Sequence, residues 1–421
     1  MPYGRHSQSP RATAQIENEA SGHKSVTVIR SAPPMKTTPT FLPRLTLALF
    51  LSYLSVALSL TAVPVFVLSW PGFNNVLAGL AVGIPFLSTI FTRNYAGQIA
   101  DATGGHRCMR RGLVLYALAC GLCLFSTLPA LPSAGHYGVL IAGRLLLGLG
   151  ESLCIVGMMG WSIALAGQPK AGKVMAWTGA AMYGAFAVGG PVGLIMYQHF
   201  GFAALMLLSA ALPLAGLLLI STVPGAPLHI GHREPFWSIL NKIRGPGLAV
   251  ALQGVGFASL GAFLSLRFLQ AGWPYAGWGL TCFGAAFVGM RMLCGHLPDR
   301  IGGLKVALPS LLLEACGLAL IWSAHTPEIA LVGAFLTGAG CSMVYPSLGV
   351  EVVHRVPAPM RSTALGGYSA FQDLAYATTG PLAGFLADRT GYAEVFLLGS
   401  LCAMLGAGVV CLLLALKPHN A

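Results

Sequence analysis

Two charged residues, Arg144 and Glu151, stand seven positions apart in one long apolar stretch, a spacing of two turns along one face of a helix. Glu151 can take up and release a proton, and a nearby Arg144 can modulate its proton affinity. A static ion pair that joins helices is the alternative interpretation. The pair is the first candidate for the chemistry of this protein.

Asp373 is the second candidate carboxylate, and polar side chains flank it in its own apolar stretch. Tyr368, Gln372 and Tyr376 recur at four-residue spacing and form one polar and aromatic stripe. Such a stripe suits the wall of a binding cavity, because apolar faces supply contact area and hydroxyls or amides supply orientation. Gln253 lies in the middle of another apolar stretch and joins this set. A buried hydrogen bond within its own bundle of helices is the alternative role for Asp373.

Glu314 lies in the middle of a further apolar stretch, and Arg291 lies at a similar depth in the preceding one. We expect a structural pair between these two residues rather than a proton site. Arg267 lies near the end of its stretch, where a long side chain can extend its charged head to water.

The elements that position these residues are expected to be membrane-spanning helices. Of the 421 residues 55% are hydrophobic and 9% charged, whereas soluble domains carry about 25% charged residues. A helix needs about 20 apolar residues to cross a bilayer. Twelve such stretches occur, at 45–68, 77–100, 109–129, 137–165, 172–197, 202–222, 246–270, 275–297, 305–323, 328–352, 362–387 and 392–416. The predicted fold class is an all-α membrane protein with twelve transmembrane helices.

Polar segments divide these helices into two sets of six. Residues 1–40 are rich in Ser, Thr and Pro and are expected to form a disordered cytoplasmic tail. A first six-helix bundle over 41–222 is expected to be followed by a cytoplasmic linker over 223–245. A second bundle over 246–421 completes the chain.

The net charge of +12 follows the expected topology. With the N-terminus inside, 19 of the 24 Lys and Arg fall on the cytoplasmic side and one, Arg389, on the other. This asymmetry is a positive-inside signal, and it predicts that both termini are cytoplasmic. The basic excess therefore indicates orientation in a membrane and not a nucleic-acid partner.

An internal repeat relates the two sets. A shift of 198 residues aligns Arg93-x3-Gly97-x3-Asp101-x2-Gly104-Gly105-x-Arg107 with Arg291-x3-Gly295-x3-Asp299-x2-Gly302-Gly303-x-Lys305. A shift of 190 aligns Gly143-x4-Gly148-x-Gly150-x-Ser152 with Gly333-x4-Gly338-x-Gly340-x-Ser342, and Gly190-Pro191 with Gly380-Pro381. Parallel repeats of this kind build transporters with a site shared between two bundles. The second shift places Ala334 and Cys341 opposite Arg144 and Glu151, so the scaffold is duplicated and the charges are not.

These motifs resemble those of the major facilitator superfamily (MFS), over nearly all of the chain after residue 40. The two aligned loops are similar to the family signature Gly-x-Leu-x-Asp-Arg-x-Gly-Arg-Lys/Arg, and Arg144-x3-Gly148-x-Gly150 is similar to its helix-four motif. The Gly-Pro pattern around Pro191 looks like the helix-five motif of proton-driven exporters. The whole looks most like a bacterial efflux-type branch, with drug and sugar exporters as neighbours. The resemblance implies two six-helix bundles that alternate around a central site.

Short polar loops that carry the duplicated motif are expected to control the conformational change. The glycines permit a tight turn between two helices. Asp101 and Asp299, expected at the C-terminal ends of helices, are badly placed for their own helix dipoles and should therefore seek partners elsewhere. The resemblance implies that such contacts form in one conformation and break in the other. The expected gating residues are Gly97, Asp101, Gly104, Arg107, Gly295, Asp299, Arg300 and Gly302, and Gly190, Pro191, Gly380 and Pro381 are expected to pack helices.

Other functions are disfavoured by what the apolar stretches lack. Gly167-x4-Gly172-Lys173 has the spacing of a phosphate loop, but Val174 replaces the Ser or Thr that binds the metal. An intramembrane enzyme would need a metal site or a Ser-His pair within the bilayer. All eleven histidines lie in tails, loops or span ends, so the apolar stretches provide neither. A channel would need repeated polar rings. We expect no enzymatic activity, no cofactor and no metal.

The sequence thus predicts a multi-pass secondary transporter of the bacterial inner membrane. Its expected activity is proton-coupled export (antiport) of a small solute by alternating access. The alternative is a proton-coupled importer (symporter) of a solute such as a sugar or an organic acid. The expected partners are the solute, protons and membrane lipid, with no nucleic acid, and the expected state is a monomer.

Overall fold

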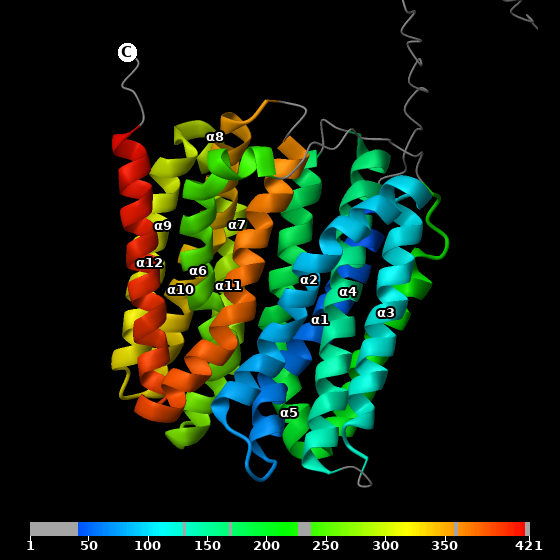
Figure 1. Cartoon of the computed structure of the whole chain (residues 1–421), viewed down its shortest axis with the longest axis vertical. Coiled ribbons are helices and arrows are strands. Elements are labelled where there is room, and N and C mark those ends of the chain that lie inside the picture. The colour runs from blue at the N-terminus through cyan, green and yellow to red at the C-terminus, as the bar shows by residue number, and fades with distance from the viewer. Residues whose placement is uncertain (1–40, 129–131, 168–170, 226–236, 358–360, 417–421) are drawn as a thin grey trace, which may run out of the picture. The chain divides into compact units, whose positions relative to one another are not determined.

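The computed structural model describes residues 41–128, 132–167, 171–225, 237–357 and 361–416, and within them every regular element is a helix (Figure 1). The helices, in chain order, are α1 (Phe41–Leu68), α2 (Asn75–Thr103), α3 (Gly105–Phe125), α4 (Ser133–Ala166), α5 (Ala171–Ile220), α6 (Trp237–Gln270), α7 (Trp278–Cys294), α8 (Leu297–Ile301), α9 (Gly303–Ser323), α10 (Pro327–Arg355), α11 (Arg361–Thr390) and α12 (Tyr392–Ala415).

Most expected helices are found, with three differences. The stretches expected at 172–197 and 202–222 form one element, α5, which breaks at Gly201 where φ is 79°. Helix α6 begins at Trp237, inside the segment expected as a linker. Helix α7 ends at Cys294, and the short helix α8 follows it. The expected tail, 1–40, and residues 226–236 of the expected linker lie outside the described residues.

The helices have the length and composition that a bilayer requires. Among the described residues nine helices are long and apolar enough to cross a membrane, and α7 is a shorter apolar helix of 17 residues. Helix α11 is less apolar because it carries the polar stripe around Asp373. The chain is therefore a multi-pass membrane protein, and the count of twelve spans stays a prediction.

Helices from the two halves of the sequence meet along two lines of contact. Helix α2 packs against α11, and α5 packs against α7, as Figure 1 shows for α2 and α11. We call these contacts the α2–α11 seam and the α5–α7 seam. We also name the two ends of the helices by α2: the Asn75 end, at the bottom of Figure 1, and the Thr103 end at the top.

The α2–α11 seam is closed by glycine at the Asn75 end. A Cβ atom on Gly79 would lie 2.0 Å from the carbonyl oxygen of Gly380, and one on Gly83 would lie 2.7 Å from that of Ala377. Only glycine permits two backbones to approach this closely, as in other membrane helix pairs. On the α5–α7 seam a Cβ atom on Gly190 would lie 2.8 Å from the carbonyl oxygen of Gly277. Gly190 and Gly380, two of the expected packing residues, therefore lie where the halves meet.

A polar contact completes this closure. The backbone amide of Asn75 donates to Asp388 Oδ1 at 3.2 Å, and its Nδ2 donates to the same oxygen at 2.7 Å. The hydroxyl of Tyr392 donates to Asn75 Oδ1 at 2.9 Å. A carboxylate at a helix N-terminus is favourable, because it accepts from an amide that has no partner within the helix. The start of α2 is thus held by the end of α11.

Candidate functional site

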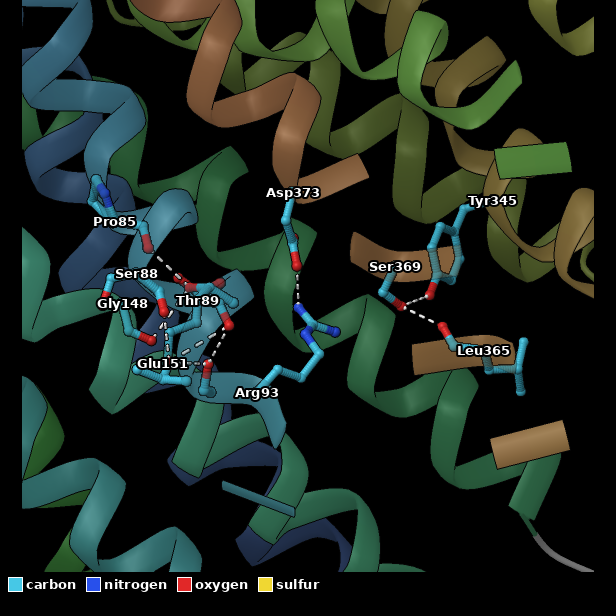
Figure 2. A network of polar contacts seen from close by, with 12 residues as sticks. Pro85, Ser88, Thr89, Arg93, Gly148, Glu151, Tyr345, Leu365, Ser369 and Asp373 are labelled. Atoms are coloured by element: carbon cyan, nitrogen blue, oxygen red, sulfur yellow. Dashed lines mark hydrogen bonds and ion pairs between the residues drawn. The ribbon is translucent and has the colours of Figure 1, made fainter. Parts of the chain in front are cut away.

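An ion pair joins the two halves across the α2–α11 seam. Arg93, on α2, donates from Nη2 to Asp373 Oδ2, on α11, at 2.6 Å. Their side chains are 26% and 10% exposed, so little water screens the pair. Figure 2 shows Arg93 extending across to Asp373. The hydrogen bond of Asp373 therefore reaches the other half of the chain. Its alternative role, a hydrogen bond within its own bundle, does not describe this contact.

Glu151 lies close to this pair on α4. It is 7% exposed and accepts a hydrogen bond from the hydroxyl of Tyr53, on α1, at 2.8 Å. Among the described residues no Lys or Arg forms an ion pair with Glu151, although it lies within electrostatic reach of Arg93 and Asp373 (Figure 2). A buried carboxyl in contact with a neutral hydroxyl can exist in either protonation state.

Among the described residues Arg144 forms no ion pair with Glu151, so the alternative interpretation, a static ion pair, does not hold, although Arg144 lies within electrostatic reach of the carboxyl. Its Nε donates to the carbonyl oxygen of Ala81 at 2.8 Å, and its Nη1 donates to Ser59 Oγ at 3.0 Å. The proline at position 85 has no N–H, so the carbonyl of Ala81 loses its partner within α2. Arg144 supplies the missing donor and holds this part of α2 against α1 and α4.

The glycines that follow Arg144 have related packing roles. A Cβ atom on Gly148 would lie 2.0 Å from the carbonyl oxygen of Pro85, and one on Gly150 would lie 3.1 Å from the backbone nitrogen of Tyr116. The helix-four motif therefore joins α4 to α2 through its arginine and first glycine, and to α3 through its second glycine.

This packing predicts a strong stability effect at Arg144. Arg144→Met should lower the free energy of unfolding by roughly 1–3 kcal/mol, because the buried carbonyl of Ala81 loses its charged donor. Thermal unfolding of the purified protein measures this effect. Arg300→Met, at an exposed position, is the matched control and should change it little. Equal melting temperatures in the two variants would contradict the role given to Arg144.

Aromatic side chains from both halves pack beside the ion pair. The rings of Phe86 and Tyr376 lie 4.9 Å apart across the α2–α11 seam. Those of Tyr183 and Phe287 stack at 3.4 Å across the α5–α7 seam. Phe257, on α6, contacts both groups, with ring centroids 5.2 Å from Tyr376 and 6.0 Å from Tyr183. The polar groups are therefore bordered by apolar contact area from both halves.

The expected stripe on α11 divides among three environments. Tyr376 faces Phe86 of the other half. Gln372 donates from Nε2 to Oε1 of Gln253, on α6, at 3.2 Å. Tyr368 is fully buried and its hydroxyl donates to the carbonyl of Tyr345 at 3.0 Å, so it belongs to the core of its own half. Tyr368 is thus not a wall of a shared cavity.

The expected pair between Glu314 and Arg291 is wrong. Arg291 donates from Nη2 to the carbonyl oxygen of Ser342, and its guanidinium lies 5.1 Å from the ring centroid of Phe287. Glu314 is fully buried and accepts from Gln253 Nε2 at 3.4 Å. The carboxyl is therefore part of a polar chain inside the second half.

The duplicated loop motif has glycine where its turns require it. Gly104 has a φ of 88° and Gly302 a φ of 98°, and each separates two helices. Asp101 lies in the last turn of α2, as expected, whereas Asp299 lies in the first turn of α8 and not at the end of a helix. The side chains of Arg107, Asp299 and Arg300 are exposed at the Thr103 end. Gly97 is buried in α2, and Gly295 follows α7.

One cavity of about 320 Å³ lies at the Asn75 end of the α5–α7 seam, and its walls include Pro191, Gln198, Trp273 and Trp278. None of the candidate carboxylates lines it. Among the described residues no cluster of His, Cys, Asp or Glu could hold a metal ion.

Arg93 and Tyr53 are functional candidates that sequence reasoning missed. Arg93 was visible as the first residue of the repeated motif, but nothing in the motif indicates Asp373 as its partner. Tyr53 stands in a wholly apolar helix, where an aromatic residue is usually core. Neither partner could be found without the packing of the helices.

Comparison with known proteins places this arrangement in a family. The sequence profile of the Major Facilitator Superfamily matches residues 45–275 and 246–421. An uncharacterised MFS-type transporter of Salmonella typhimurium is 45% identical over 372 residues, which cover 88% of this chain and 96% of the relative. One of Burkholderia mallei is 38% identical over 86% of this chain and 88% of its own.

Solved structures share the fold at low identity. The D-xylose–proton symporter has a TM-score of 0.74 with 16% identity, and the alignment covers 88% of this chain and 96% of that one. The nucleoside transporter NupG has a TM-score of 0.73 with 13% identity, over 88% and 99%. With helices, seams and relatives in agreement, the chain belongs to the Major Facilitator Superfamily of transporters.

Proposed function

We propose that this transporter exports a small amphiphilic or polar solute in exchange for protons, by alternating access at the bacterial inner membrane. The observation that carries the proposal is the buried ion pair between Arg93 and Asp373, which joins the two halves beside the carboxyl of Glu151. The distribution of basic residues supports a cytoplasmic Thr103 end and a periplasmic Asn75 end. The described conformation is then the one closed toward the periplasm.

Protons act in this mechanism through a competition for Arg93. When Glu151 is protonated it is neutral, and Arg93 bonds only to Asp373, which holds α2 against α11. When Glu151 loses its proton, it attracts Arg93 back toward its own half, because opposite charges interact strongly where water is excluded. The ion pair across the seam then weakens, and the Asn75 end can open. Proton binding therefore favours the conformation that is closed toward the periplasm.

The solute site is inferred to lie between Phe86, Tyr376 and Phe257, beside Gln372. The rings supply apolar area, and the amide and the ion pair orient polar groups of the solute. In an exchange cycle, solute that enters from the cytoplasm promotes loss of the proton from Glu151. The Asn75 end then opens and releases the solute to the periplasm.

Glu151→Gln tests the coupling directly. Reconstituted protein should lose pH-gradient-driven transport by at least about 100-fold, because the amide cannot release a proton. Exchange of solute across the membrane without a gradient should persist, because the Gln side chain can still accept from Tyr53. Counterflow and gradient-driven flux of a labelled panel of sugars, nucleosides, organic acids and cationic dyes measure both.

Ser152→Ala, next along α4, is the control that leaves the carboxyl in place. Uphill transport at the wild-type rate in Glu151→Gln would contradict the role of Glu151 in coupling. Accumulation on the acidic side of vesicles is expected for exchange, whereas accumulation on the alkaline side would identify a symporter.

A further inference from the structure

Each half of the chain contains a buried Glu that forms no ion pair among the described residues, Glu151 in the first and Glu314 in the second. The internal repeat does not align these two residues with each other. The shift of 190 that aligns α4 with α10 places Cys341 at the position of Glu151. The shift of 198 that aligns α3 with α9 places Glu314 at the position of Tyr116. The first half therefore has its carboxyl on α4 beside a phenol on α3, and the second half has its carboxyl on α9 beside a thiol on α10.

The packing supports these equivalences. A Cβ atom on Gly150 would lie 3.1 Å from the backbone nitrogen of Tyr116, and one on Gly340 would lie 2.5 Å from that of Glu314. Each carboxyl-bearing pair also receives a hydrogen bond from the first helix of its half. Tyr53, on α1, donates to Glu151, as Gln253, on α6, donates to Glu314.

Neutral groups surround Glu314 on every side. Gln253 faces it from α6 and Cys341 from α10, and the hydroxyl of Tyr376, on α11, lies within electrostatic reach. On α12, Ser400 donates to the carbonyl oxygen of Ala315 beside it. No ion pair in the described part of the chain includes Glu314, and its Oε2 is buried without a hydrogen-bond partner. A carboxyl so placed is far more stable neutral than charged.

Hydrogen bonds connect this buried group to the partly exposed side of α11. Glu314 is 0% exposed and Gln253 is 2% exposed, whereas Gln372 is partly exposed. Gln253 Nε2 donates to Glu314 Oε1 at 3.4 Å and to Cys341 Sγ at 3.1 Å. Gln253 Oε1 accepts from Gln372 Nε2 at 3.2 Å. The chain runs from α9 through α6 to α11, where Asp373 is the next residue.

The direction of these bonds is fixed from the Glu314 end. An amide has one donor end and one acceptor end. While Glu314 Oε1 accepts, Gln253 must point its nitrogen at it and its oxygen at Gln372. Gln372 then donates inward and presents its own oxygen outward. If Glu314 instead donates its acid proton to Gln253, the amide groups of both glutamines rotate by half a turn and exchange their donor and acceptor ends. The terminal torsion of a Gln side chain permits this rotation, because its preferred angles are broad and two-fold.

We propose that Glu314 is a second proton-binding carboxyl, and that its hydrogen-bonding state sets which end of the Gln372 amide is presented on the partly exposed side of α11. Glu314 is a positioning residue here, since it acts through Gln253. The consequence for transport rests on the solute site proposed above. In one state the second half offers the solute an acceptor, and in the other it offers a donor.

Infrared difference spectroscopy of the full chain tests this proposal without a solute. The protein is reconstituted in vesicles of phosphatidylethanolamine and phosphatidylglycerol, and spectra are taken in H₂O and D₂O at neutral pH. The Glu151→Gln variant serves as background, because it removes the other buried Glu that has no ion-pair partner among the described residues, whereas Glu351 pairs with Arg355. A carboxylic-acid C=O band should be present there and should be lost when Glu314→Gln is added.

The same band should shift in frequency in Gln372→Leu, although Gln372 does not touch Glu314, and stay in place in Leu374→Ala. Leu374 is 51% exposed on the same helix and is the matched control. A band that Gln372→Leu leaves unmoved would overturn the coupling, and a spectrum without an acid band assignable to Glu314 would overturn the proton site. If Glu314→Gln fails to fold, the frequency shift of the carboxylic-acid band in Gln372→Leu still tests the coupling between Glu314 and Gln372. Since no transport is measured, failure here is distinguishable from failure of the proposed exchange.

Discussion

Asp373→Asn should reduce gradient-driven transport by at least about tenfold and should weaken closure at the Asn75 end. The change leaves the guanidinium of Arg93 partly buried without its counter-charge. Removal of one partner from a buried, hydrogen-bonded ion pair typically costs about 2–5 kcal/mol, much of it from the charge left behind. Because the pair exists only when α2 and α11 are together, this loss applies to one conformation and shifts the equilibrium between the two.

Hydrogen exchange reports this shift directly. Backbone amides at the start of α2 and the end of α11 should exchange faster in Asp373→Asn and in Arg93→Gln. The double variant should be less impaired than the sum of the two single variants, because neither charge is then left unpaired. Glu328→Gln removes a carboxylate at an exposed position outside the expected gating residues and is the control for loss of charge alone. Additive effects in the double variant would show that the two residues act independently.

The helices and turns that position the site could be predicted from the sequence better than the contacts between its side chains. Uninterrupted apolar stretches define most helices, because few other structures can satisfy the backbone in a bilayer. Turn glycines such as Gly104 and Gly302 could be predicted because both the repeat and their position between helices marked them. Burial of Arg144, Glu151 and Asp373 followed from their place within apolar stretches.

The partners of these charges could not be predicted in the same way. Periodicity assigns a residue to a face of its helix and does not show which helix packs on that face. Arg93 meets Asp373 from 280 positions away, and Arg144 bonds to α2 because Pro85 frees a carbonyl there. That proline was a signal in the sequence, and so was Tyr116, the repeat position of Glu314. To use these two signals, the search for partners would have had to include backbone carbonyls and neutral side chains as well as charged residues.

Gly79→Val should abolish closure of the α2–α11 seam and reduce transport by at least about tenfold in either direction. A Cβ atom at this position would lie 2.0 Å from the carbonyl oxygen of Gly380, a backbone atom that cannot rotate away. Overpacking in well-packed interiors costs about 1–3 kcal/mol even where side chains can adjust. Here the two helices must separate, which also disturbs the contacts of Asn75 with Asp388 and Tyr392 at the same end.

The effect is specific to one conformation, and Gly121→Val is the control that shows it. Gly121 lies in α3, and no atom outside the neighbouring backbone of that helix lies within 4 Å of a Cβ atom built on it, so this variant changes helix propensity by the same amount without a clash. Both variants should insert and unfold cooperatively, whereas only Gly79→Val should show fast hydrogen exchange at the Asn75 end and lose both counterflow and gradient-driven flux. Glu151→Gln, by contrast, should retain counterflow. Wild-type counterflow in Gly79→Val would mean that the close approach of α2 and α11 is not a step of the transport cycle.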